Sequence, residues 1–152
     1  MEEAHVAEIL DGLRAFGANY TEFTTRFAGS LGLHSTDATA LVEILYAEDK
    51  GAPLSPTRLS ERLSLTTGAT TNLLNRLERL GHIVRTREHT DRRVVTLRSS
   101  SQIEAPAREF FGPFYGNLQA LVAQYPPEQV EQFENFLSHL RTSMTDLLAD
   151  QS

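Results

Sequence analysis

The apolar residues at the start of the chain recur at alternating steps of three and four positions. They are Val6, Ile9, Leu13, Phe16, Tyr20, Phe23 and Phe27. On an α-helix these steps place every member on one stripe, a pattern typical of a long helix that packs along another helix. The pattern predicts a helix from about Glu3 to Phe27, which Gly29 and Gly32 end.

The end of the chain carries the same periodicity. We expect one helix from Ser101 or Ala105 to Tyr125 and, after a break at two prolines, another from Pro127 to about Leu148. The apolar positions of the last helix are Val130, Phe133, Leu137, Leu140, Met144 and Leu147. Residues 1–30 and 101–152, which we call the arms, are therefore predicted to form a helical dimerisation lobe.

The matching stripes of the two arms are able to pair within one chain, between two chains, or both. A helix as long as the first one usually extends beyond its own domain in a small protein, which favours a partner chain, and we therefore expect a homodimer. The residues predicted to lie in its interface are Val6, Ile9, Leu13, Phe16, Phe133, Leu137, Leu140, Met144 and Leu147.

Between the arms the elements become shorter. A mostly buried helix is predicted from Ser35 to Asp49, with Ser35 or Thr36 as its cap and Gly51 as its end. Its apolar positions are Leu41, Val42, Ile44 and Leu45.

Two further helices joined by a tight turn follow. Ser55 caps the first of them, Pro56 fits its first turn, and Leu59 and Leu63 form its buried side. After the turn, Thr66 or Thr67 caps a second helix that is predicted to end at Leu80, before Gly81.

A β-hairpin is predicted directly after these helices. The runs Ile83–Arg87 and Val94–Leu97 alternate in polarity around a polar tip at residues 88–92. Helix, turn, helix and hairpin in this order form a winged helix-turn-helix. The expected fold class is mainly α with a small β-hairpin wing (α+β), in which this motif is flanked by dimerisation helices. We expect a single domain over residues 1–152, in which residues 35–100 form a winged helix-turn-helix DNA-binding lobe, the central lobe.

The second of the two short helices has an unusual outer face. A spacing of 100° per residue puts Ala69, Thr70, Leu73, Leu77 and Leu80 on the inner side, with Leu74 at its edge. Asn, Thr and Gly, which are poor helix formers, dominate the opposite side. Asn and Arg are the side chains that make bidentate contacts with base edges in a major groove. The predicted base contacts are Thr67, Gly68, Thr71, Asn72, Asn75 and Arg76. The alternative is an ordinary solvated helix face.

The charge distribution supports a nucleic-acid partner only locally. The chain has a formal net charge of −6. Residues 55–100, however, contain nine arginines and four acids, which gives +5, and the rest of the chain carries −11. A basic centre between acidic arms favours binding to phosphate, although a general preference of this chain for Arg over Lys is the plainer explanation of the residue type. The predicted phosphate contacts are Ser55, Arg58, Arg62 and Arg79.

The tip of the hairpin is predicted to contact DNA as well. An arginine at such a tip is able to enter a narrow minor groove, where the potential is negative. Asp91 is either an ordinary turn residue or the partner of a nearby arginine, which would set the direction of the tip. The residues assigned to this contact are Arg87, Asp91, Arg92 and Arg93.

Several other classes of protein are not supported by the sequence. Without cysteine there are no disulfides, thiolate metal sites or thiol redox sensors. No phosphate-binding glycine loop or catalytic triad spacing is present, and the five histidines are scattered, so we expect no enzyme, no metal and no cofactor. No segment has the length of a membrane span or the order of a secretion signal. A soluble cytoplasmic protein is the simplest interpretation.

The segment LSERLSLTTGATTNLLNRLERLGHIVRTREHTDRR resembles the winged helix of the MarR family of bacterial transcription regulators. The matching features are the leucine-spaced helix that ends in RLERLGHIVR and the Asp-x-Arg wing signature at Asp91-Arg92-Arg93. The resemblance implies that Arg93 enters the minor groove, that residues 67–75 face the major groove, and that helices of both arms form an obligate dimer. One departure is Ser99-Ser100, where the family often has Leu-Thr.

The resemblance further implies a ligand-responsive repressor that binds a palindromic operator in double-stranded DNA. Its effector would be a small aromatic or phenolic anion bound between the arms and the winged helix. The aromatic residues Tyr20, Phe23 and Phe27, near His34, are candidates for such a pocket, but core packing is the better explanation, and no ligand residue is assigned. The alternative function is a winged-helix protein-interaction module without specific DNA binding.

Overall fold

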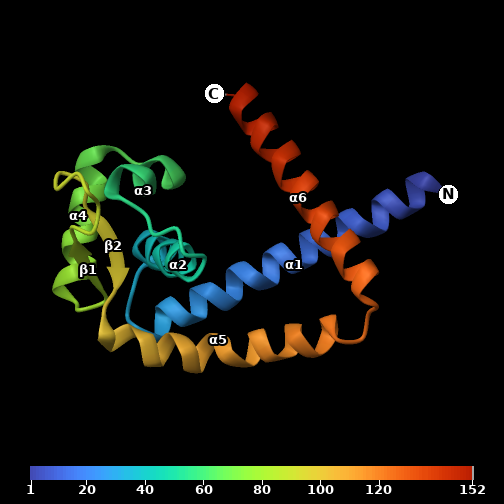
Figure 1. Cartoon of the computed structure of the whole chain (residues 1–152), viewed down its shortest axis with the longest axis horizontal. Coiled ribbons are helices and arrows are strands. Elements are labelled where there is room, and N and C mark those ends of the chain that lie inside the picture. Colours follow the sequence, from blue (N-terminus) through green and yellow to red (C-terminus); the bar gives the residue numbers. More distant parts are fainter. Residues whose placement is uncertain (152) are drawn as a thin grey trace. The chain divides into compact units, whose positions relative to one another are not determined.

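Six helices and one two-stranded antiparallel sheet make up residues 1–151, the part of the chain that the computed structural model describes (Figure 1). The elements are α1 (Glu2–Ser30), α2 (Ser35–Asp49), α3 (Pro56–Leu63), α4 (Thr67–Arg79), β1 (Ile83–Thr86), β2 (Thr96–Ser99), α5 (Ser101–Val122) and α6 (Pro127–Asp150). This order confirms the predicted fold class. The chain divides into two compact units, Met1–Phe110 and Phe111–Ser152. The division into a central lobe and arms stays a prediction.

Local capping signals determine where α3 and α4 begin. The Ser55 hydroxyl accepts a hydrogen bond from the Arg58 amide at 3.2 Å, and Thr66 Oγ1 accepts one from the Ala69 amide at 3.1 Å. Each bond satisfies an amide that would otherwise lack a partner in the first helical turn. Between the two helices Ser64 adopts the left-handed conformation, with φ of 53°, and thereby forms the tight turn. The predicted Ser55 cap and the predicted tight turn between the two helices are confirmed.

The predicted cap of α2 and the predicted end of α1 were wrong in detail. Ser35 begins α2 as a helical residue, and its cap position is His34, which makes no side-chain capping bond, so neither Ser35 nor Thr36 caps this helix. Gly29 lies inside α1, which continues to Ser30 because the left-handed φ of 73° that ends the helix belongs to Gly32.

One hydrophobic core joins the elements of the first unit. Its large, fully buried side chains come from the end of α1, from α2, α3, α4, both strands and the start of α5. They are Phe27, Leu41, Ile44, Leu59, Leu73, Leu74, Leu77, Ile83, Leu97 and Ile103. Leu80, predicted to lie on the inner side of α4, is instead 55% exposed, because it occupies the cap position beyond the last full turn. Ala69, also assigned to the inner side, is exposed.

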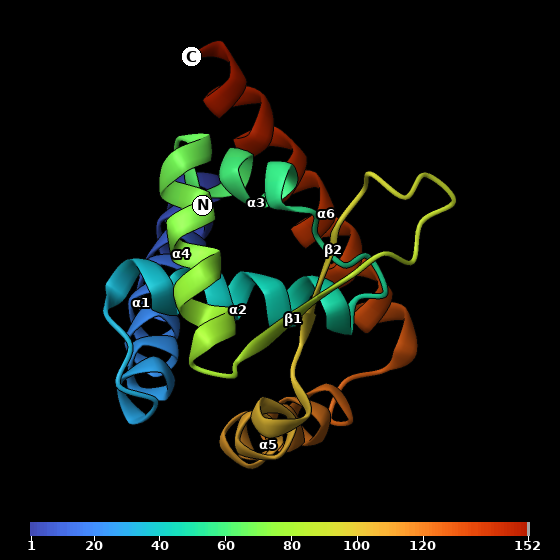
Figure 2. The ribbon, with the colours of Figure 1, turned by 90° about the vertical axis from the view of Figure 1, so that its left-hand side faces the viewer.

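The second strand of the hairpin differs from the predicted bounds. Ile83 pairs with Ser99 and Thr86 pairs with Thr96, so the second strand begins and ends two residues later than expected. The amide of Leu97 donates to the carbonyl of Leu54 at 2.8 Å, and its side chain is fully buried, which fixes this strand against the core. The connection is therefore longer than predicted, and residues 87–95 form a wing loop that extends away from the helices (Figure 2).

The aromatic residues at the end of α1 are packing residues. The rings of Phe23 and Phe27 lie 4.6 and 5.2 Å from that of Phe110 in α5, between centroids, and Phe27 is 1% exposed. Offset and tilted arrangements at these distances are favourable for aromatic rings. The preferred explanation of core packing is confirmed for these residues.

The apolar stripes of the arms are largely exposed. Seven of the nine predicted interface residues expose about half of their surface, and Leu13 and Leu140 are half-buried. The seven exposed residues are Val6, Ile9, Phe16, Phe133, Leu137, Met144 and Leu147. Apolar stripes on helices of this length are typical of surfaces that another helix covers.

Candidate nucleic-acid interface

The outer face of α4 carries all six residues that were predicted to contact bases. Thr67, Gly68, Thr71, Asn72, Asn75 and Arg76 are exposed, whereas Thr70, Leu73 and Leu77 on the opposite side are buried. This division follows from the helical repeat, because the buried positions attach α4 to the core and leave the polar ones outside. The structure therefore presents one continuous polar helix face to solvent.

The two asparagines of this face differ in their surroundings. The Asn75 side-chain oxygen accepts a hydrogen bond of 2.7 Å from Arg85 of β1. Since a guanidinium only donates, this contact turns the amide NH₂ of Asn75 away from Arg85. Asn72 makes no side-chain hydrogen bond with any residue that the structure describes, so both its donor and its acceptor are available.

Arg76 makes a bidentate ion pair rather than projecting freely from α4. Its Nε and one Nη donate to the two carboxylate oxygens of Asp37 at 3.0 and 2.8 Å. The Asp37 side chain is only 12% exposed, and the hydrogen bond to it raises the pKa of Arg76. Asp37 carries no signal of this pairing in the sequence, because an acid in the first turn of a helix needs no explanation beyond the helix dipole.

Arg62 and Arg98 also face carboxylates. An Nη of Arg62 lies 3.1 Å from Glu43 of α2. Arg98 of β2 binds both oxygens of Glu88 at 2.7 and 2.9 Å and lies 3.7 Å from Glu48 of α2. The bonds from Arg98 and Thr86 lower the pKa of Glu88 to about 2. Arg62 was predicted to contact phosphate, and its ion pair with Glu43 could be found only from the tertiary structure.

The remaining candidates for phosphate contacts are differently placed. Ser55 uses its hydroxyl to cap α3. The guanidinium groups of Arg58 in α3 and Arg79 at the end of α4 are exposed, and within residues 1–151 neither has an ion-pair or hydrogen-bond partner. Because no acid within residues 1–151 pairs with them, both remain uncompensated positive charges on α3 and α4.

The wing loop contains the pair that was proposed for its tip. Arg93 Nε and an Nη lie 3.1 Å from the two carboxylate oxygens of Asp91, whose Oδ1 also accepts the Arg93 amide at 3.0 Å. These bonds lower the pKa of Asp91. The Arg93 side chain is still 91% exposed, and Arg87 donates to the carbonyl of Arg92. Asp91 thus fixes the direction of an arginine at the end of the wing, while its role towards DNA stays a prediction.

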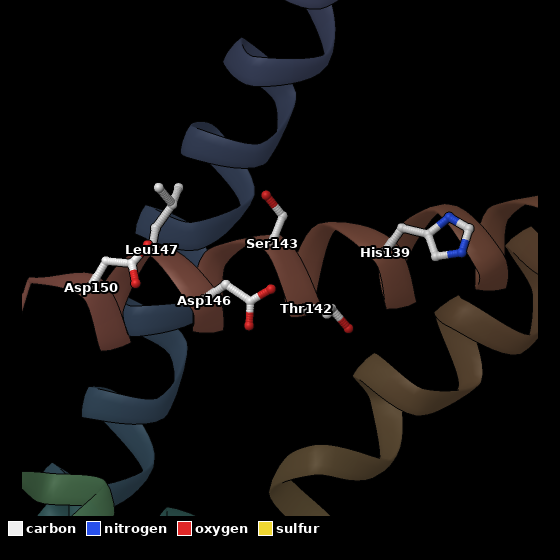
Figure 3. Close-up of a pocket in the computed structure, with 6 residues that line it drawn as sticks. All are labelled: His139, Thr142, Ser143, Asp146, Leu147 and Asp150. Atoms are coloured by element: carbon white, nitrogen blue, oxygen red, sulfur yellow. The ribbon is translucent and has the colours of Figure 1, made fainter.

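The described residues offer no second site of comparable chemistry. No group of three or more His, Asp or Glu side chains among them has the arrangement of a metal site. A shallow hollow along α6 is lined by His139, Thr142, Ser143, Asp146, Leu147 and Asp150, all from this one helix (Figure 3). A hollow with a single wall encloses little of a small ligand. Over residues 1–151 no helix has the combination of length and apolarity that crossing a bilayer requires.

Comparisons with known proteins give one consistent result. The MarR family model matches residues 31–94, which include α2 to α4 and most of the wing. The chain is 27% identical over 135 residues to the HTH-type transcriptional regulator YcgE of Bacillus subtilis (strain 168), covering 89% of this chain and 85% of YcgE. A MarR family protein from Bacillus stearothermophilus has a similar structure, with a TM-score of 0.61, 26% identity, and coverage of 95% of this chain and 99% of that protein.

A DNA complex is also among the similar structures. The protein in the complex of S. aureus MepR with DNA has a TM-score of 0.56 and 20% identity to this chain, with 87% of this chain and 93% of that protein covered. At this identity the likeness concerns the fold. The fold therefore occurs in a protein whose structure has been solved on DNA.

Proposed function

Because this chain belongs to the MarR family of transcription regulators, we propose that it is a dimeric, sequence-specific DNA-binding regulator that acts as a ligand-responsive repressor in the cytoplasm. The observation that carries the proposal is the outer face of α4. It combines exposed Asn72 and Asn75 with the unneutralised Arg58 and Arg79 beside it. A helix selected only for stability would carry Glu, Lys or Ala at such positions.

The contacts follow from the position of each group. We propose that α4 enters the major groove and that Thr67, Gly68, Thr71, Asn72 and Asn75 face the base edges there. Ser55, Arg58 and Arg79 would bind phosphates on either side of the groove. Arg93, directed by Asp91, would enter the adjacent minor groove together with Arg92. Arg87, which donates to the carbonyl of Arg92, would stabilise the loop.

Dimerisation is needed for this mode of binding. One small basic lobe on an acidic chain would bind weakly, whereas two lobes on a palindromic operator bind together with a high effective concentration. We propose that the exposed stripes of α1 and α6 form the dimer interface. The two α4 helices must then lie about 34 Å apart, the length of one DNA turn, to enter successive major grooves.

The proposed effector is a small aromatic or phenolic anion. The dimer would have two conformations, which differ in the spacing of the two lobes. The effector needs only to bind more tightly to the conformation that does not fit the operator, since a ligand shifts an equilibrium by its difference in affinity for the two states. No residue of this chain is assigned to its binding.

A gel-shift titration with the DNA that flanks its own gene tests the proposal. We expect a specific complex that resists competition by random DNA and weakens steeply as salt is raised, because counterions are released from phosphates on binding. The absence of a specific complex at every salt concentration would favour the alternative, a winged-helix protein-interaction module. The exposed asparagines of α4 and the arginines of the wing loop speak against that alternative, since they have no use there.

A further inference from the structure

Helix α2 carries three carboxylates, and each of them faces an arginine from a different DNA-facing element. Asp37 lies in its first turn, Glu43 in its middle and Glu48 in its last turn. The three pairs are Asp37–Arg76 in α4 at 2.8 Å, Glu43–Arg62 in α3 at 3.1 Å and Glu48–Arg98 in β2 at 3.7 Å. The residues joined in these pairs are far apart in the sequence, so the ion pairs belong to the tertiary structure.

Asp37–Arg76 is the strongest of the three pairs. Both carboxylate oxygens are bound by Nε and Nη of one guanidinium, in the planar geometry that favours this contact. A carboxylate that is only 12% exposed requires a charged partner, because an unpaired charge at such depth is strongly unfavourable. Arg76 is therefore held in place, and contact of its guanidinium with a base would leave Asp37 without a partner.

The other two pairs are closer to solvent but also have support. Glu48 accepts the amide of Ser99 at 3.2 Å as well as facing Arg98, so it holds the backbone of β2 in addition to a side chain. Glu43 and Arg62 are 35% and 43% exposed, which leaves this pair partly screened.

These contacts change which charges the central lobe presents to DNA. Besides the three arginines held by α2, Arg85 lies beside Glu78 and Arg93 binds Asp91. Of the nine arginines between residues 55 and 100, the four without a carboxylate partner within residues 1–151 are Arg58, Arg79, Arg87 and Arg92.

We propose that Asp37, Glu43 and Glu48 are positioning residues: they orient α4, α3 and the wing on α2, and they withhold the arginines that they bind from DNA. This proposal rests on the proposed DNA binding. It replaces the predicted DNA contacts of Arg62 and Arg76 with roles inside the protein. Charge contacts to DNA then come from the four arginines without a carboxylate partner and from Arg93, whose side chain is 91% exposed despite its pair with Asp91. The acids of α2 limit binding to random sequences.

The full-length protein tests this through the salt dependence of its binding to a labelled random-sequence duplex. The variants are Glu43→Gln, which releases Arg62, and the matched control Glu61→Gln, which removes an equal charge from an acid of α3 that has no ion pair within residues 1–151. Arg62→Ala, Arg58→Ala and the double variant Glu43→Gln/Arg62→Ala complete the set. Circular dichroism checks that each variant is folded.

We expect Arg58→Ala to make the salt dependence shallower and Arg62→Ala to leave it unchanged. Glu43→Gln should steepen it by about one unit per protomer, since each new phosphate contact adds about 0.9 to the slope. It should also tighten binding to random DNA several-fold more than Glu61→Gln, and Arg62→Ala should remove the gain. If Arg62→Ala weakens binding as much as Arg58→Ala, or if Glu43→Gln and Glu61→Gln act alike, the withholding role is wrong.

A second measurement separates this proposal from the proposed function. Unfolding by urea is followed for Asp37→Asn, Arg76→Gln and the double variant. We expect each single variant to lower the midpoint and the double variant to lower it by much less than the sum, because the partner of each group is already lost. Additive losses would overturn the positioning role. If no variant binds DNA, the proposed function falls and the withholding role with it, whereas the double-mutant cycle still decides whether Asp37 positions α4.

Discussion

Leu77 on the apolar side of α4 is fully buried, whereas Leu137 on the apolar stripe of α6 is 55% exposed. The same contrast extends over both regions. In the central lobe the apolar stripes meet one another in a single core, and several of the charged side chains form ion pairs. In α6 no residue is fully buried, and the charged residues of its first turn lie in solvent.

The comparison separates a region whose contacts are completed within one chain from one whose apolar surface is left for a partner. Exposed apolar stripes of this length are costly in water, because each buried methylene group contributes about 0.8 kcal/mol. The arms are thus where a second copy would stabilise the protein. The central lobe instead directs its uncompensated charges, including Arg58 and Arg79, towards solvent.

Breaking the stripe of α6 should have the largest effect. Leu137→Asp places a charge in the proposed interface and should produce monomers, which lose operator affinity by roughly a hundredfold or more because the second lobe no longer binds together with the first. Sedimentation velocity and fluorescence anisotropy measure the two effects. Ser138→Asp, one position away from the stripe, is the control and should remain dimeric. A dimeric Leu137→Asp protein would contradict the assignment of the interface.

Breaking the core of the central lobe should act on stability. Leu77→Ala removes a fully buried side chain and should lower the free energy of unfolding by about 2–5 kcal/mol. Leu80→Ala, at a site that is 55% exposed, should change it by less than about 1 kcal/mol. Urea unfolding measures both free energies. The dependence of the free energy of unfolding on urea concentration should be the same in the two variants as in the wild type. Equal losses for the two variants would show that α4 is not attached to the core as described.

Substitutions on the outer face of α4 should change the sequence specificity of DNA binding. Asn72→Ala is expected to reduce discrimination against a changed base pair of the operator by about 1–3 kcal/mol, since a bidentate amide contact is lost. Binding to random DNA should stay nearly constant. Arg93→Ala provides the contrast, because it should weaken binding to all sequences and give a shallower salt slope. If both variants lose affinity equally on every sequence, the assignment of base contacts is wrong.

The direction of the wing loop should have a smaller effect. Asp91→Ala frees the Arg93 guanidinium, which then samples many orientations, and operator affinity should fall roughly two- to fivefold, as expected for an exposed ion pair. Anisotropy titrations at moderate salt provide the comparison. Unchanged affinity would reduce Asp91 to an ordinary turn residue.

The smallest expected effect is a pH dependence of stability that comes from Glu88 at the base of the wing. The Glu88 carboxylate is bound by Arg98 and Thr86, which lowers its pKa from 4.5 to about 2. Because the pKa is lower in the folded protein, this contribution to stability is present above pH 4.5 and is lost as the pH falls towards 2. Carbon-13 NMR of the Glu88 side chain should show this midpoint, and Arg98→Ala should return it towards 4.5. A wild-type midpoint near 4.5 would exclude the Glu88–Arg98 pair in solution.

Local patterns were sufficient for most of the elements. The bounds of α2, the Ser55 cap of α3 and the polar outer face of α4 were predicted because each depends on neighbours within one or two helical turns. The bounds of the second strand were not predicted correctly. The hydrogen bond between the Leu97 amide and the Leu54 carbonyl fixes the position of this strand, and no periodicity within the hairpin reveals that contact.

The candidate site, too, could be predicted only in part from the sequence. The sequence by itself determined that Arg58, Asn72 and the wing arginines lie at the surface, because the helical repeat and the turn residues decide exposure locally. Only the tertiary structure decided which arginines remain available. Arg76 finds Asp37 across 39 residues of sequence, and such a pair depends on how the helices pack around a common core. A repeat of 3.6 residues defines the face on which a side chain lies, whereas folding determines which charge it meets there.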